Sequence, residues 1–124
     1  MIIRCWGSRG SVPVSGKKFL RYGGNTTCLE IRTKDNQILI VDAGTGIREA
    51  GLSLIKDQQH DLTLLLTHAH WDHIIGFPFF KPIYSHKTIL NIWGCPFAQT
   101  SIKQMLGRTM EAPNFPISFD AIAS

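Results

Sequence analysis

The sequence predicts an α+β fold in which one β-sheet carries about two to three helices. Five short stretches have the apolar or alternating pattern of strands, two stretches have apolar side chains at helical spacing, and glycine-, proline- or polar-rich turns separate them. The chain has 124 residues, which is enough for one small domain with its own core. The length is not enough for two domains.

The strands are expected at residues 2–6, 26–33, 37–41, 62–66 and 88–94, and a further strand is expected to begin within 115–120. Residues 34–36 have the composition of a hairpin turn. Between residues 28 and 33, Cys28, Glu30 and Arg32 alternate with Leu29, Ile31 and Thr33, as in a half-buried strand. Residues 38–41 are apolar throughout, which favours a central strand.

Two helices are expected, at residues 47–56 and 97–110. The inner face of the first is expected at Ile47 and Leu52 with Ile55 or Leu54, and that of the second at Ile102, Met105 and Leu106. Gly51 weakens the first helix. The aromatic and proline-rich residues 74–82 have two interpretations, core packing or one wall of a substrate pocket, and core packing is the more common.

The most informative stretch is residues 67–73, which holds three histidines and one aspartate directly after the apolar run 62–66. Imidazole and carboxylate are ligands that suit zinc and related divalent metals. A strand that delivers His68 and His70 two residues apart points both side chains the same way, because side-chain direction repeats every second residue. Asp72 and His73 follow as the backbone turns away. The spacing predicts half of a two-metal site.

Asp42 follows the apolar run 38–41 and is itself followed by Ala43, Gly44, Thr45 and Gly46. It has two interpretations, a turn or helix-capping residue, or a carboxylate that orients a ligand histidine. Its place at a strand end, like that of the histidines, favours the second. His86 lies before a predicted strand, where a surface histidine is the better interpretation.

The chain has 13 basic and 9 acidic side chains, a net charge of +4. Basic side chains gather at the polar loop after the first strand, which is either a solvated basic loop or a phosphate-facing rim: Arg4, Arg9, Lys17, Lys18 and Arg21. The mildly positive field favours an anionic substrate, with nucleic acid as a possible substrate only.

No apolar run reaches the roughly 20 residues of a membrane span, and we expect a cytoplasmic location. Cys5, Cys28 and Cys95 have neither disulfide nor zinc-knuckle spacing.

The pattern His68-Ala69-His70-Trp71-Asp72-His73 resembles the first metal-binding motif of the metallo-β-lactamase superfamily. Residues 7–11, 22–28 and 42–46 are similar to a branch of that superfamily related to RNase Z and to phosphodiesterases. The resemblance implies an αββα sandwich of two mixed sheets, with two divalent metal ions at one edge. Zinc is expected, with manganese or iron as alternatives. His68 and His70 would bind one ion, and Asp72 and His73 the other.

The resemblance implies hydrolysis of a phosphodiester by a metal-activated water, which Asp72 would also orient. A thioesterase or an oxidoreductase of the same fold is an alternative. By this resemblance, a further histidine for each ion and a bridging aspartate would come from later segments, where His86 is the only histidine of the chain. We therefore expect residues 1–124 to be the N-terminal half of such a domain, one half-sandwich. Such a piece would form a homo-oligomer or need the C-terminal half, and a non-catalytic interaction unit is a further alternative.

Overall fold

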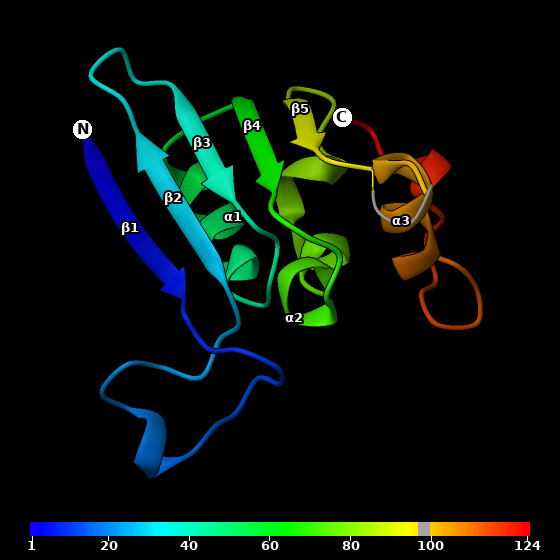
Figure 1. Cartoon of the computed structure of the whole chain (residues 1–124). Helices are drawn as coiled ribbons and strands as arrows, with labels where there is room; N and C mark the ends of the chain where they lie inside the picture. Colours follow the sequence, from blue (N-terminus) through cyan, green and yellow to red (C-terminus); the bar gives the residue numbers. More distant parts are fainter. Residues whose placement is uncertain (97–99) are drawn as a thin grey trace.

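A five-stranded mixed sheet forms the centre of the structure, a computed structural model that describes residues 1–96 and 100–124 (Figure 1). The strands, in spatial as well as chain order, are β1 (Ile2–Gly7), β2 (Cys28–Arg32), β3 (Ile38–Val41), β4 (Asp61–Leu66) and β5 (Ile89–Gly94). β2 is antiparallel to β1 and β3, whereas β3, β4 and β5 are parallel. This confirms the predicted α+β fold with one mixed sheet.

The described residues contain three α-helices, α1 (Ile47–Lys56), α2 (Trp71–Ile74) and α3 (Ile102–Thr109). Four short 3₁₀ helices accompany them: η1 (Lys17–Phe19), η2 (Phe77–Phe79), η3 (Lys81–Tyr84) and η4 (Phe119–Ala121). α1 has the predicted bounds. The start predicted for the second helix, at Phe97, lies outside the described residues. The described helix α3 follows a capping box in which Ser101 and Gln104 bond to each other's backbone.

The strand expected within residues 115–120 is absent from the described structure, which instead has a turn and then η4. Pro113 precedes this segment and Pro116 lies within it, and proline has no backbone N–H to donate to a sheet. The expectation of a strand there is therefore wrong.

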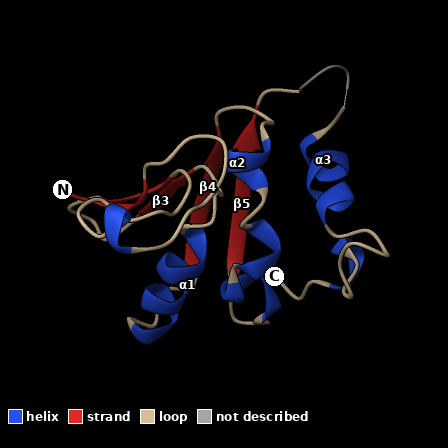
Figure 2. Cartoon of the chain, turned by 90° about the horizontal axis from the view of Figure 1, so that it is seen from below, coloured by secondary structure: helices blue, strands red, loops and turns tan. Residues whose placement is uncertain are grey.

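The core lies between one face of the sheet and a layer formed by the helices α1, η2 and η3. Figure 2 shows α1 along that face of the sheet. Ile40 on β3 and Leu64 on β4 are fully buried there. Phe77 and Phe80 are also fully buried, so the proline-rich residues 74–82 contribute to the core, as the more common interpretation predicted.

The inner face of α1 consists of Ile47, Ala50, Gly51 and Leu54. Ile55 is 41% exposed, so of the two alternatives offered for that position Leu54 is the inner residue. The face is centred on small residues because the helix packs closely: a Cβ at Gly51 would lie 2.8 Å from Cδ2 of Phe80. Gly51 therefore permits this packing although it weakens the helix.

The buried face of β2 is its more polar one. Glu30 is fully buried and accepts a 2.7 Å hydrogen bond from Nε1 of Trp6. Arg32 also bonds to Glu30, and its Nη2 donates to Asp57 at 2.8 Å at the end of α1. These contacts compensate the buried charge, which hydrophobic alternation alone does not predict.

The opposite face of the sheet exposes apolar side chains. Strand register places Cys5, Leu29, Val41, Leu65 and Trp93 in one row across all five strands. Leu65 is 38% exposed and Trp93 64% exposed. We call this surface the open face. Within residues 1–96 and 100–124, no helix has the length and apolar character that a membrane crossing requires.

Candidate metal centre

The histidine motif lies at the edge of the sheet where the parallel strands β3 and β4 both end, beside α2 (Figure 1). β4 stops at Leu66, so His68 and His70 stand on the connection to α2 and not on the strand, contrary to the interpretation that a strand presents them. Asp72 and His73 lie in α2, where the backbone has turned, as expected.

The three imidazole rings nevertheless come together. The ring centroids of His68 and His70 are 4.5 Å apart, and those of His68 and His73 are 4.0 Å apart. His70 is exposed, while His68 and His73 are half-buried. The turn into α2 brings the rings together, because the His73 amide bonds to the carbonyl oxygen of His70 at 3.0 Å.

Asp42 fixes the orientation of His73. Its side chain is buried, and its Oδ2 lies 2.8 Å from Nδ1 of His73. The carboxylate is an acceptor, so Nδ1 of His73 carries the proton and Nε2 keeps its lone pair for another partner. Asp42 has a φ of 63°, a left-handed conformation that aspartate tolerates in turns. The contact between Asp42 and His73 therefore supports the orienting role that the sequence favoured for Asp42.

Thr67 links Asp42 to His68 and thereby sets the tautomer of this second histidine. Its hydroxyl lies 2.9 Å from Oδ1 and 2.8 Å from Oδ2 of Asp42, and 3.0 Å from Nδ1 of His68. A hydroxyl has one proton, which the carboxylate takes, so the Thr67 oxygen accepts from Nδ1 of His68. Nε2 of His68 is then also free to bind a metal. Sequence reasoning gave Thr67 no role, although its place directly before the motif was the available signal.

Asp72 is held by the loop that joins β1 to β2. The amide of Ser11 donates to Oδ2 of Asp72 at 2.9 Å. This hydrogen bond is the largest cause that holds the pKa of Asp72 below its usual value, with smaller contributions from His73 and His70. An ionised carboxylate is the form that binds a cation. Ser11 is a second contact that the sequence did not predict.

The donor atoms of Asp72 and His73 have a separation that fits one metal ion. Oδ2 of Asp72 lies 3.4 Å from Nε2 of His73. Two donors, each about 2.1 Å from a tetrahedral ion, lie about 3.4 Å apart. In the described part of the chain, no group of three or more His, Cys, Asp or Glu side chains is arranged to hold one ion. The described residues therefore fit a divalent metal by donor type and by this pair, and further donors would complete the coordination.

Two glycines allow the strand end that carries Asp42 to pack directly on α2. A Cβ at Gly44 would overlap the carbonyl oxygen of Asp72, and one at Gly76 would overlap the carbonyl oxygen of Gly44. The Ala43 amide donates to the carbonyl oxygen of His73 at 2.7 Å. Gly44 and Gly76 thus permit this close approach.

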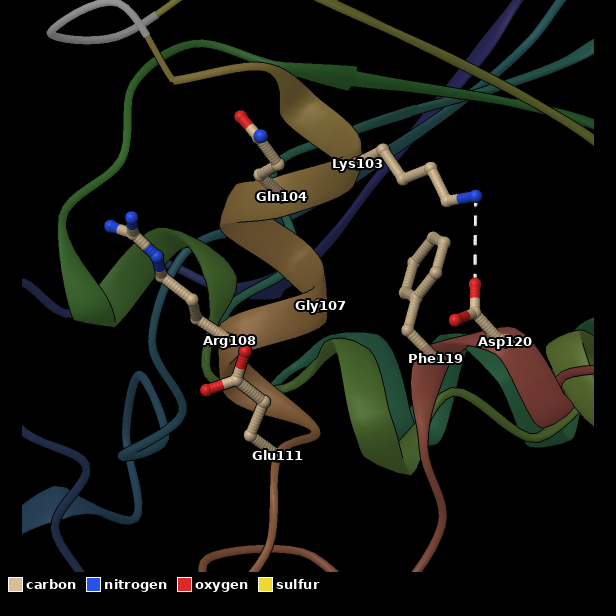
Figure 3. Close-up of a pocket in the computed structure, with 7 residues that line it drawn as sticks. All are labelled: Lys103, Gln104, Gly107, Arg108, Glu111, Phe119 and Asp120. Atoms are coloured by element: carbon tan, nitrogen blue, oxygen red, sulfur yellow. Dashed lines mark ion pairs between the residues drawn. The ribbon is translucent and has the colours of Figure 1, made fainter.

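Other predicted residues stand apart from the motif. The guanidinium of Arg9 bonds to the Val12 carbonyl oxygen at 2.8 Å and lies over the Phe19 ring, so this side chain braces its own loop. His86 is exposed in the turn before β5, as expected of a surface histidine. Figure 3 shows a hollow between α3 and η4, with the pair Lys103–Asp120, that contains none of the motif residues.

Comparison with known proteins agrees with this geometry. The family model of the metallo-beta-lactamase superfamily matches residues 21–102. The chain belongs to the metallo-beta-lactamase superfamily. The match includes the whole histidine motif and Asp42, and the superfamily generally binds divalent metals. Neither a curated protein nor a solved structure shows significant similarity to the chain.

Proposed function

We propose that this metallo-beta-lactamase-family chain carries the first metal-binding half of a metal-dependent hydrolase. The observation that carries the proposal is the pairing of Asp72 with His73, whose donor atoms are 3.4 Å apart while Asp42 holds the far nitrogen of the imidazole. A fixed imidazole tautomer and an ionised carboxylate are what a metal ligand pair needs.

In the proposed site, His68 and His70 hold one divalent ion, and Asp72 and His73 hold a second. Zinc suits these ligands best, with manganese or iron as alternatives. When bound, such ions lower the pKa of a water and neutralise charge on the oxygens of the substrate. Asp42 and Thr67 keep the imidazole Nε2 atoms available, and Asp72 orients the attacking water. The chain would then need no serine or cysteine nucleophile.

The proposed substrate is a phosphodiester, as in the phosphodiesterase and RNase Z branch. Its support is the distribution of charge. Residues 8–25 contain four basic side chains and no acidic one, and removing four from 13 leaves nine basic against nine acidic residues elsewhere. This loop carries the whole net charge and contacts the motif through Ser11. It would attract an anionic ester towards the metal ligands, whether a cyclic nucleotide, an RNA end or a small diester.

We also propose that the remaining ligands come from outside the described residues, so that residues 1–124 act as the N-terminal half of an αββα domain. In support, no three donor side chains in the described part are arranged to hold one ion, and the open face is an apolar sheet surface of the kind that a second layer buries. Alone, the chain would cover this face by forming a homo-oligomer. Light scattering should show a dimer or larger species, and a folded monomer at high dilution would contradict this.

Hydrolysis of bis(p-nitrophenyl) phosphate by the full-length protein tests the function. We expect activity that chelation removes and that the variant His70→Ala lacks. His86→Ala is the matched control, because His86 is also an exposed histidine but lies outside the motif. Turnover of a thioester without diester hydrolysis would favour the thioesterase alternative. A stable oligomer without bound metal would favour a non-catalytic interaction unit in the cytoplasm, where we propose the protein resides.

A further inference from the structure

A pocket of about 290 Å³ lies directly beside the metal motif. Its lining in the described structure comes from the motif and α2 on one side and from α3 on the other: Ala69, Trp71, Ile74, Thr100, Met105, Arg108 and Thr109. Ala69 and Trp71 are the residues immediately before and after His70. The pocket therefore starts one residue away from a proposed metal ligand.

The two walls of this pocket differ in origin. Ala69, Trp71 and Ile74 lie within residues 21–102, which the superfamily model matches, whereas Met105, Arg108 and Thr109 lie beyond them. The first wall thus lies in the part of the chain that the family model matches, and the second wall, apart from Thr100, lies beyond it. A wall of that kind is suited to select among substrates rather than to perform the common chemistry.

The side chains in the pocket combine an apolar floor with one cation. Ile74 and Met105 are buried, and the ring of Trp71 is 64% exposed beside them. Arg108 is exposed, and Figure 3 shows its guanidinium on the side of α3 away from the pair Lys103–Asp120. A flat apolar group can pack on Trp71, while Arg108 offers paired N–H donors to an anionic oxygen.

We propose that this pocket binds the organic group of the substrate ester, an aromatic ring, against Trp71, with Arg108 pairing to an oxygen of the attached phosphate. The volume of the pocket suits one ring rather than a large ligand. The inference rests on the proposed phosphodiester hydrolysis and specifies its substrate class as aryl or nucleoside phosphodiesters.

Binding without metal tests the pocket separately from catalysis. The probe is p-nitrophenyl phosphate, titrated calorimetrically into the full chain in excess chelator. We expect Trp71→Ala and Arg108→Gln each to weaken binding about tenfold, and Trp71→Phe to retain most of it. Trp93→Ala is the matched control, because Trp93 is also 64% exposed but lies on the open face. Arg48→Gln is the control for charge, because Arg48 is an exposed arginine on α1.

Kinetics with two diesters of the same leaving group provide the second measurement. We expect a KM for bis(p-nitrophenyl) phosphate about tenfold lower than for methyl p-nitrophenyl phosphate, and we expect Trp71→Ala to abolish this difference. If the aryl phosphate binds through Trp71 and Arg108 but no diester is hydrolysed, the proposed function fails and the pocket assignment stands. If diesters are hydrolysed and Trp71→Ala leaves both KM values and the binding unchanged, the pocket assignment is overturned.

Discussion

Oδ2 of Asp42 lies 2.8 Å from Nδ1 of His73, and through the hydroxyl of Thr67 the same carboxylate also reaches Nδ1 of His68. One buried aspartate at the end of β3 therefore sets the tautomer of two histidines that follow β4. The parallel pairing of these two strands brings their carboxyl ends to one edge of the sheet. The metal chemistry of the chain depends on this arrangement more than on any single ligand.

The variant Asp42→Asn should lower zinc affinity about 10- to 100-fold. Asparagine tolerates the φ of 63° at this position, so the backbone should keep its conformation. Its amide can present a donor where the carboxylate accepts, which disfavours the tautomer with a free Nε2. Competition with a chromophoric chelator measures the affinity. Asp61→Asn, at the exposed start of β4, is the control, and equal affinities for the two variants would refute the role of Asp42.

The variant Gly44→Ala should destabilise the fold by about 2 kcal/mol and weaken metal binding as well. The added methyl group would overlap the carbonyl oxygen of Asp72, so α2 would have to move away from Asp42. Urea denaturation and metal titration provide the two measurements. Gly10→Ala is the matched control, because its Cβ would meet Oδ2 of Asp72 at an ordinary 3.9 Å. A Gly44→Ala protein with native stability would contradict the close packing.

Loss of the buried carboxylate in Glu30→Ala should cost about 3 kcal/mol of unfolding free energy. The change removes the acceptor of Trp6 and leaves Arg32, whose side chain is 13% exposed, with Asp57 alone. Denaturant midpoints with unchanged slopes would measure this. Glu49→Ala breaks an exposed pair with Arg48 and should change stability by less than about 0.5 kcal/mol. Similar costs for the two variants would show that the buried network contributes little.

The three cysteines should react with a thiol reagent at different rates. Cys28 is buried, and burial together with the nearby carboxylates of Glu30 and Asp42 raises its pKa, so little thiolate forms at neutral pH. Cys5 and Cys95 are exposed and should react first. Cys5 lies in the row of the open face, so self-association should slow its reaction as protein concentration rises, while Cys95 remains the internal reference. A Cys5 rate independent of concentration would argue against burial of the open face.

Much of the fold was accessible from the sequence because its signals are local. The apolar periodicity of residues 47–56 gave α1 its correct bounds, and the four metal-ligand residues within 68–73 indicated the family. The features that the sequence left open have tertiary causes. Ile55 has an apolar side chain but faces solvent, because Ala50 and Gly51 allow the closer packing on Phe80. Glu30 can be buried because two side chains donate hydrogen bonds to its carboxylate. One donor is Trp6, on the neighbouring strand, and the other is Arg32, on the same strand.

In the candidate site too, some features have local sequence signals and others depend on tertiary contacts. The donor types and their spacing were visible in the chain, and Asp42 was suggested by its place at a strand end. The contacts of Ser11 with Asp72 and of Thr67 with Asp42 join residues 61 and 25 positions apart, so no local pattern predicts them. The pocket beside Trp71 likewise depends on how α3 lies against α2.

The most direct test of the account is the metal content of the full chain after equilibrium dialysis against zinc, with His73→Ala and His86→Ala measured in parallel. We predict that the wild-type protein and His86→Ala bind at least one equivalent of zinc and that His73→Ala binds much less, since it loses one atom of the 3.4 Å donor pair with Asp72. Absence of zinc from the wild-type protein, or the same zinc content in all three proteins, would contradict the central claim that this motif is a metal site.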